Sequence, residues 1–92
     1  MKLSDSAIDA WLAIHDRWSR KGDQIECSFV FPTFAAGIAF VQRVAVMADE
    51  ADHHPDIDIR YTRINIALST HDAGGLTQRD TDLAEQIEAT AG

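Results

Sequence analysis

The sequence predicts an α+β fold in the order α-β-β-α-β-β-α, with a single four-stranded antiparallel sheet and three helices packed on one face. Two pairs of short stretches alternate apolar and polar residues across tight turns, which is typical of antiparallel hairpins. Three further stretches repeat apolar residues every three or four positions, as amphipathic helices do. An antiparallel sheet with all helices on one side buries every one of these apolar faces.

The first helix is expected within LSDSAIDAWLAIHD, residues 3–16. Ser4 or Ser6 can cap its N-terminus, because a serine oxygen accepts a hydrogen bond from a free N–H group of the first turn. The apolar stripe of this helix comprises Ile8, Trp11, Leu12 and His15.

The first hairpin is expected to turn at Gly22 and Asp23, with Trp18 in its first arm. Its second arm is IECSFVF, residues 25–31, whose inward face comprises Ile25, Cys27, Phe29 and Phe31. Cys27 is the only cysteine, so no disulfide forms within the chain. We interpret it as a small buried apolar side chain rather than a reactive thiol.

The longest helix is expected at FAAGIAFVQRVAVMADEA, residues 34–51, after Pro32 and an N-capping Thr33. Its predicted apolar stripe comprises Phe34, Ile38, Val41, Ala45 and Ala48, widened by Val44 and Met47. Pro55 biases the residue before it away from helical conformation, so this helix is expected to end near the neighbouring pair of histidines.

The second hairpin is expected to join DIDIRY, residues 56–61, to RINIALST, residues 63–70, through Thr62. Its inward side chains are expected to be Ile57, Ile59, Tyr61, Ile64, Ile66 and Leu68. The following HDAGG, residues 71–75, is expected to be a loop in which both glycines can take positive φ.

The last helix is expected to begin at a capping box formed by Thr77 and Asp80. Asp80 occupies the third helical position, where a carboxylate can accept a hydrogen bond from the N–H group of the capping residue. The apolar stripe of this helix comprises Leu83, Ala84 and Ile87.

The composition predicts one domain, residues 1–92, without internal repeats. A chain of this length buries roughly 60–65% of its unfolded surface, so self-association would add to a modest core. The net charge of −7 repels phosphate backbones and anionic lipid, so we expect no binding to nucleic acid or membranes. The start, MKLSDSAIDA, lacks the apolar core of a signal peptide, which predicts a cytoplasmic protein.

Three of the four histidines lie where predicted elements end: His53 and His54 after the long helix, and His71 after the last strand. Neighbouring side chains point to different sides of a strand or helix, which argues against a core role for both members of the pair. The acidic residues near them in the sequence are Asp49, Asp52, Asp56 and Asp72. Imidazoles among carboxylates can donate and accept protons near neutral pH, so the pattern predicts acid/base chemistry.

Three other interpretations use the same residues. Imidazoles and a carboxylate can bind zinc, although neither H-x-x-x-H nor H-E-x-x-H spacing is present. Ser69 lies two residues before His71, but the sequence lacks the elbow motif of a serine nucleophile. The histidines can also simply cap the ends of helices and strands. We favour the acid/base interpretation because three histidines are expected to converge among acidic residues, and this chemistry needs no metal and no cofactor.

Residues 48–88 combine several short motifs, which are Asp49, His53-His54-Pro55, Ser69-Thr70-His71, Gly74-Gly75-Leu76-Thr77 and Arg79-Asp80. In this combination and order they strongly resemble the pterin-4a-carbinolamine dehydratase family. The preceding FVFPTFAAGIAFVQRVAVMAD, residues 29–49, fits the second strand and long helix of that family more loosely.

The resemblance implies an enzyme that dehydrates 4a-hydroxytetrahydropterin to quinonoid dihydropterin, the recycling step that follows aromatic amino-acid hydroxylation. It implies that His53 and His71 serve as acid and base and that His54 orients the pterin. The carboxylates would hold the imidazoles or touch the substrate, and the expected substrate-binding residues are Asp49, Asp52, Ile57 and Asp80. Members of the family associate through a sheet edge and a helix bundle, so we expect a homodimer or homotetramer.

One residue departs from the family pattern. Many members carry tryptophan two residues after the proline, where this chain has Ile57. Loss of that aromatic surface costs about 1 kcal/mol of substrate binding and leaves the proton chemistry in place. Some relatives with this fold are assembly or interaction proteins, which is the alternative function. The presence of all three histidines favours catalysis.

Overall fold

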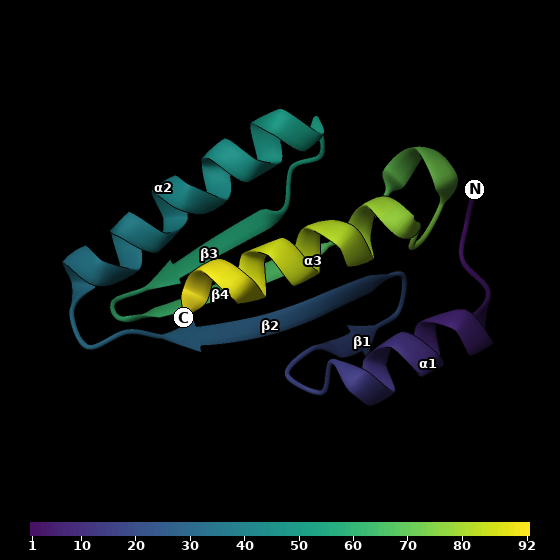
Figure 1. Cartoon of the computed structure of the whole chain (residues 1–92), viewed down its shortest axis with the longest axis horizontal. Helices are drawn as coiled ribbons and strands as arrows, with labels where there is room; N and C mark the ends of the chain where they lie inside the picture. The colour runs from purple at the N-terminus through teal and green to yellow at the C-terminus, as the bar shows by residue number, and fades with distance from the viewer.

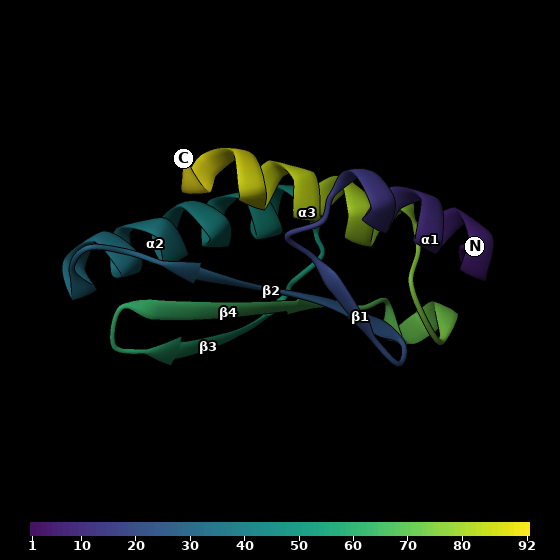
Figure 2. The same cartoon turned by 90° about the horizontal axis from the view of Figure 1, so that it is seen from below.

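The computed structural model describes residues 1–92, and its elements follow the predicted order (Figure 1). They are α1 (Asp5–Ile14), β1 (Ser19–Lys21), β2 (Gln24–Val30), α2 (Phe34–Ala51), β3 (Asp56–Arg60), β4 (Arg63–Leu68), the 3₁₀ turn η1 (His71–Ala73) and α3 (Gln78–Ala91). Figure 2 shows all three helices on the same side of the sheet. The predicted α+β class and layer arrangement are therefore confirmed.

The four strands form one antiparallel sheet in the order β1-β2-β4-β3. Ile66 lies opposite Cys27 of β2 on one side and opposite Ile57 of β3 on the other. Because opposed residues share a face, these three side chains all point towards the helices. The strands β1 and β3 are the two edges of the sheet.

Helix α2 packs on the core through a face that differs in part from the predicted stripe. Its buried residues are Gly37, Phe40, Val44 and Ala48. Phe40 was absent from the prediction, whereas Phe34 is 48% exposed and Ala45 is also exposed. Helix α2 lies beside α3 as well as over the sheet, and Arg43 Nε donates to Thr90 Oγ1 of α3 at 3.0 Å. The sheet and the neighbouring helix together decide which side of α2 is buried, since the ring of Phe40 packs on that of Phe29 in β2.

The edge strand β3 also buries less than predicted. Ile64, Ile66 and Leu68 of the central strand are buried as expected, but Ile57 is only half-buried and Ile59 is 41% exposed. Tyr61 lies beyond the strand, in the turn, with φ of 52° and 74% exposure. An edge strand has a neighbour on one side only, so alternation of apolar residues does not guarantee their burial.

Two smaller expectations also differ from the structure. Trp18 lies immediately before β1 rather than inside it, although its side chain is buried. Gly74 has a positive φ of 70°, whereas Gly75 does not. The N-caps are as expected, since Ser4 Oγ accepts from Ala7 N–H and Thr33 Oγ1 accepts from Ala36 N–H.

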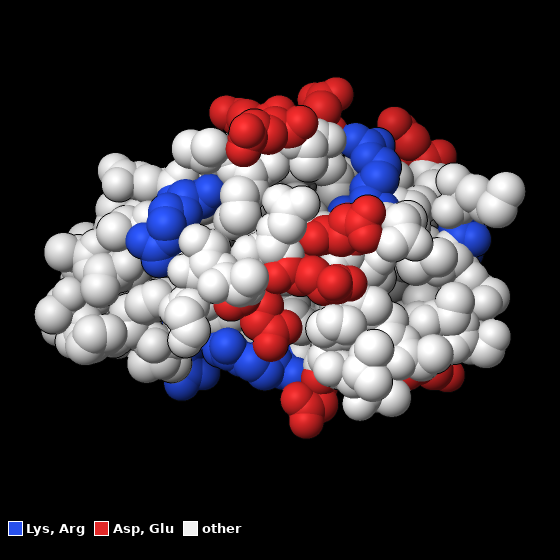
Figure 3. Space-filling model, viewed as in Figure 1, with Lys and Arg blue, Asp and Glu red and all other residues white.

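Acidic residues outnumber basic ones, fifteen against eight. Figure 3 shows acidic side chains over the C-terminal end of α2 and along α3, with basic side chains in smaller separate groups. None of the helices combines the length and the apolar character that crossing a bilayer requires.

Candidate active site

The C-terminal end of α2 aims the histidine pair at the start of α3. Asp52 adopts the left-handed conformation, with φ of 49° and ψ of 44°. Asp52 N–H donates to the carbonyl of Asp49, and His53 N–H donates to the carbonyl of Ala48 at 3.1 Å. These two bonds are those of a Schellman motif, which ends a helix and turns the chain sharply. The turn directs His53 away from the axis of α2.

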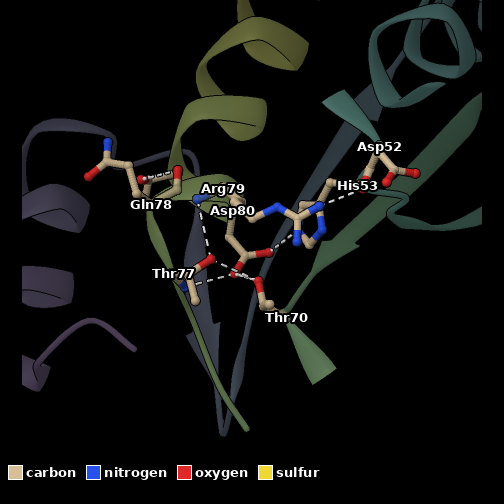
Figure 4. Close-up of polar contacts among 8 residues, drawn as sticks. Asp52, His53, Thr70, Thr77, Gln78, Arg79 and Asp80 are labelled. Carbon is tan, nitrogen blue, oxygen red and sulfur yellow. Dashed lines mark hydrogen bonds and ion pairs between the residues drawn. The ribbon is translucent and has the colours of Figure 1, made fainter. Parts of the chain in front are cut away.

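Arg79 ties this turn to α3. Its Nη2 donates to the carbonyl oxygen of Asp52 at 2.5 Å (Figure 4). A carbonyl that follows a helix end has no helical partner of its own, so the guanidinium satisfies it. The backbone just before His53 is thereby attached to the first turn of the neighbouring helix.

The side chain of His53 forms a buried pair with Asp80. His53 Nε2 lies 2.6 Å from Asp80 Oδ1, and the two side chains are 8% and 0% exposed. An ionised carboxylate can only accept, so His53 Nε2 is protonated and donates a hydrogen bond to Asp80 Oδ1. The other ring nitrogen, Nδ1, has no hydrogen-bond partner within the chain and is free to exchange a proton with a ligand.

The second carboxylate oxygen of Asp80, Oδ2, accepts two further hydrogen bonds that hold the side chain in place. Asp80 Oδ2 accepts from Thr70 Oγ1 at 2.7 Å and from the N–H group of Thr77 at 2.9 Å (Figure 4). The second of these bonds belongs to the predicted capping box at the start of α3. Asp80 therefore has two roles: it caps the first turn of α3, where a carboxylate is favoured, and it is the partner of His53.

The other two histidines are exposed. His54 Nε2 lies 2.9 Å from Asp49 Oδ1, and the two side chains are 61% and 78% exposed. His71 begins the 3₁₀ turn and makes no hydrogen bond through its ring. Water therefore reaches both rings, in contrast to the buried pair formed by His53.

All three histidines line one cavity of about 290 Å³. Its lining contains no hydrophobic residue and consists of Asp52, His53, His54, Ser69, Thr70, His71, Asp72 and Arg79. Two segments far apart in the sequence, one at the end of α2 and one after β4, supply the imidazoles. The convergence expected from the sequence is present in the structure.

The four residues expected to bind substrate occupy different places. Asp52 lines the histidine cavity. Asp49 contacts His54, and Asp80 lies fully buried behind His53. Ile57 lies in β3 beside a separate hollow of about 350 Å³, which Glu26, Ser28 and Asn65 also border; these three alternate with the helix-facing residues, so the hollow lies on the open face of the sheet.

Thr70 and Arg79 belong to this site, although neither was predicted from the sequence to have a role there. Thr70 directly precedes His71, and Arg79 directly precedes Asp80. Their places within these motifs are the feature of the sequence that could have indicated a role. Their contacts depend on how the end of α2 meets α3, which sequence spacing does not specify. No group of three or more histidine, cysteine, aspartate or glutamate side chains is arranged to hold a metal ion.

The chain is similar in sequence to the proteins of one family. The model of the family described as "Pterin 4 alpha carbinolamine dehydratase" matches residues 1–90. A protein of Roseiflexus sp. (strain RS-1), provisionally named pterin-4-alpha-carbinolamine dehydratase, is 51% identical over 95% of this chain and 94% of its own length. A protein of Acidobacterium capsulatum with the same provisional name is 51% identical over 96% of each chain.

Two solved structures are also similar. A transcriptional coactivator/pterin dehydratase from Brucella melitensis superposes with a TM-score of 0.96 at 31% identity, over the full length of both chains. A pterin dehydratase-like protein, described as a RuBisCO assembly factor in the alpha-carboxysome, gives a TM-score of 0.68 at 27% identity. The second match covers 83% of this chain and 88% of that one. With a family match over nearly its whole length and relatives at half identity, this chain belongs to the pterin 4 alpha carbinolamine dehydratase family.

Proposed function

We propose that this protein removes water from 4a-hydroxytetrahydropterin to form quinonoid dihydropterin, with histidines as the acid and the base. The observation that carries the proposal is the polar cavity shared by His53, His54 and His71, in a chain of the pterin 4 alpha carbinolamine dehydratase family. A pterin presents nitrogen and oxygen atoms around its rim, which suits a lining made entirely of polar residues.

The reaction requires two proton transfers and no change of oxidation state. The bond between C4a and the hydroxyl oxygen breaks, and that oxygen takes up a proton to leave as water. N5 loses its proton, and its electron pair forms the C4a=N5 double bond. A positioned acid and a positioned base each accelerate such a step by about 10²–10⁴-fold.

The structure supports His53 and His71 as this pair. His53 presents an unengaged Nδ1, while its Nε2 is bound to Asp80. Neither ring nitrogen of His71 has a partner within the chain. His54 is turned to Asp49 through Nε2, which suits a role in orienting the pterin rather than in proton transfer.

The predicted substrate contacts can be divided by position. We propose that Asp52 contacts the pterin directly, because it lines the cavity. Asp49 and Asp80 would act through the imidazoles that they hold. Ile57 remains a predicted substrate contact at the position where many family members carry tryptophan, and it supplies no flat aromatic surface for the ring.

The wider role follows from the chemistry. A dehydratase of this kind returns the carbinolamine formed by a pterin-dependent hydroxylase to the pterin pool, in the cytoplasm. The protein would act as a homodimer or homotetramer without a metal or cofactor.

A dehydration assay tests the activity directly. Freshly generated 4a-hydroxytetrahydropterin should lose water faster with the protein than in buffer, and chelator treatment should leave the rate unchanged. His53→Ala and His71→Ala should each lower kcat by about 10²–10⁴-fold, whereas His54→Ala should mainly raise KM. His15→Ala is the matched control, because His15 contacts Trp11 and lies outside the cavity. A rate equal to that in buffer would contradict the proposal.

The alternative is an assembly or interaction protein without catalysis. The observation favouring it is the structural similarity to the pterin dehydratase-like assembly factor. Under this alternative the wild-type protein shows no dehydration, and substitution of the histidines leaves its binding partners unchanged.

A further inference from the structure

We propose that Thr70 is a positioning residue that acts through Asp80 to keep His53 in a single tautomer. This inference rests on the proposed function only for its effect on rate, because the tautomer itself can be measured without a substrate. Thr70 follows the last strand directly and precedes His71, and its side chain is 7% exposed.

The hydrogen bonds around Thr70 leave one consistent assignment of protons. Thr70 Oγ1 donates its one hydrogen to Asp80 Oδ2 at 2.7 Å. The contact of 2.9 Å between the hydroxyl oxygens of Thr70 and Thr77 must then be donated by Thr77. Protons therefore point in sequence from Thr77 to Thr70 and from Thr70 to the carboxylate (Figure 4).

This chain of bonds determines what Asp80 can do for His53. Two donors on Oδ2 stabilise the carboxylate as an anion, which leaves Oδ1 to accept from His53 Nε2 at 2.6 Å. The carboxylate is fully buried, so water cannot replace a donor that is lost. His53 then keeps its proton on Nε2 and presents a bare Nδ1 to the cavity whenever the ring is neutral.

Thr70→Val is the informative substitution, because valine keeps the branched shape and removes the hydroxyl. Asp80 Oδ2 would retain only the N–H group of Thr77, and the Thr77 hydroxyl would lose its acceptor. Thr70→Ser retains the donor and should restore the wild-type behaviour. Thr81→Val is the matched control, since Thr81 is also buried but bonds only to the carbonyl of Gln78 within α3.

The first measurement is the nitrogen chemical shift of the His53 ring in ¹⁵N-histidine-labelled protein, at a pH where the ring is neutral. The His53 signals are identified by their absence from His53→Gln. Wild type, Thr70→Ser and Thr81→Val should show a protonated Nε2 and a bare Nδ1. Thr70→Val should show a mixture of the two tautomers. A wild-type spectrum in Thr70→Val would overturn the proposal, whether or not the protein has dehydratase activity.

The second measurement is the rate. Thr70→Val should lower kcat by about tenfold with little change in KM, as loss of an outer partner of a functional histidine typically does. In an Asp80→Asn background the same substitution should cost less than about twofold, because coupled residues are not additive. An equal loss in both backgrounds would mean that Thr70 acts on the substrate directly, and the proposal would fail. If the wild-type protein is inactive, the proposed function is refuted. The role of Thr70 is then tested by the nitrogen chemical shifts of His53 alone.

Discussion

At the residue scale, His53 and His71 differ in burial although both stand at the end of an element. Their positions at element ends predict that substitution of any of the three cavity histidines changes stability little. His54 and His71 are exposed, but His53 is 8% exposed and paired with the fully buried Asp80. We therefore expect His53 to differ from the other two, because a buried carboxylate lies behind its ring.

We predict that His53→Ala lowers the free energy of unfolding by about 3 kcal/mol, because it leaves Asp80 as a buried charge without its partner. His71→Ala should change it by less than about 0.5 kcal/mol, as exposed substitutions usually do. Urea unfolding followed by circular dichroism measures both. Equal stabilities for the two variants would contradict the buried pair.

Cys27 gives a second residue-scale prediction. Burial raises the pKa of the Cys27 thiol from 9.0 to about 11, with Arg17 opposing this shift and Glu88 adding to it. Above pH 9 the unfolded chain releases this proton while the folded chain retains it, so stability falls as the pH rises from 9 to 11. The thermal midpoint of wild type should fall more over this range than that of Cys27→Ala. Parallel curves would exclude the thiol as the cause.

At the scale of the elements, the site is built where two helix ends meet. The Schellman turn after α2 supplies His53, and the capping box of α3 supplies Asp80. Arg79 joins the two through the carbonyl of Asp52. The capping box could be predicted from Thr77 and Asp80 because it is a local pattern, but its contact with His53 joins residues 27 positions apart.

The left-handed conformation of Asp52 can be tested with two substitutions that both remove its carboxylate. Asp52→Gly should be more stable than Asp52→Ala by about 1 kcal/mol, because glycine takes a positive φ without steric conflict. The loss of dehydratase activity should be the same in both, since neither can contact the pterin. Thermal unfolding and the dehydration assay measure the two effects. Higher stability for the alanine variant would contradict the described turn.

At the scale of the whole molecule, apolar side chains remain uncovered. Those of Val30, Phe34, Val46, Ile59 and Tyr61 are all more than two-fifths exposed. Phe34 and Tyr61 stack on each other, with ring centroids 6.5 Å apart, yet both remain exposed. The edge strand β3 adds unpaired backbone groups to this surface.

We predict a dimer or tetramer of the 10.2 kDa chain in solution, because association would cover this apolar surface and the open strand edge. Light scattering at micromolar concentration measures the mass. Val46→Glu should shift the mass towards the monomer, and Gln86→Glu, at an exposed polar position of α3, should not. A wild-type protein that is monomeric throughout would refute the prediction.

The order of elements, the hairpins, the caps and the three cavity histidines could all be predicted from the sequence. All of these depend on interactions between residues close in the chain or on repeated patterns, which a single sequence displays. The stripe of α2 was only partly predicted, since every apolar residue of that helix fits some helical face. Packing against both the sheet and α3 selects the face that holds Phe40 and Val44.

Which histidine is buried, and which carboxylate holds it, could not be predicted without the fold. Asp49, Asp52 and Asp80 were equivalent candidates in the sequence, but the fold placed one behind His53, one against His54 and one in the cavity lining. The fold also brought Thr70 against Asp80 and left Ile57 on a separate hollow. Such contacts depend on where helix ends and strands meet in space, and hydrogen bonds are formed or lost over fractions of an ångström.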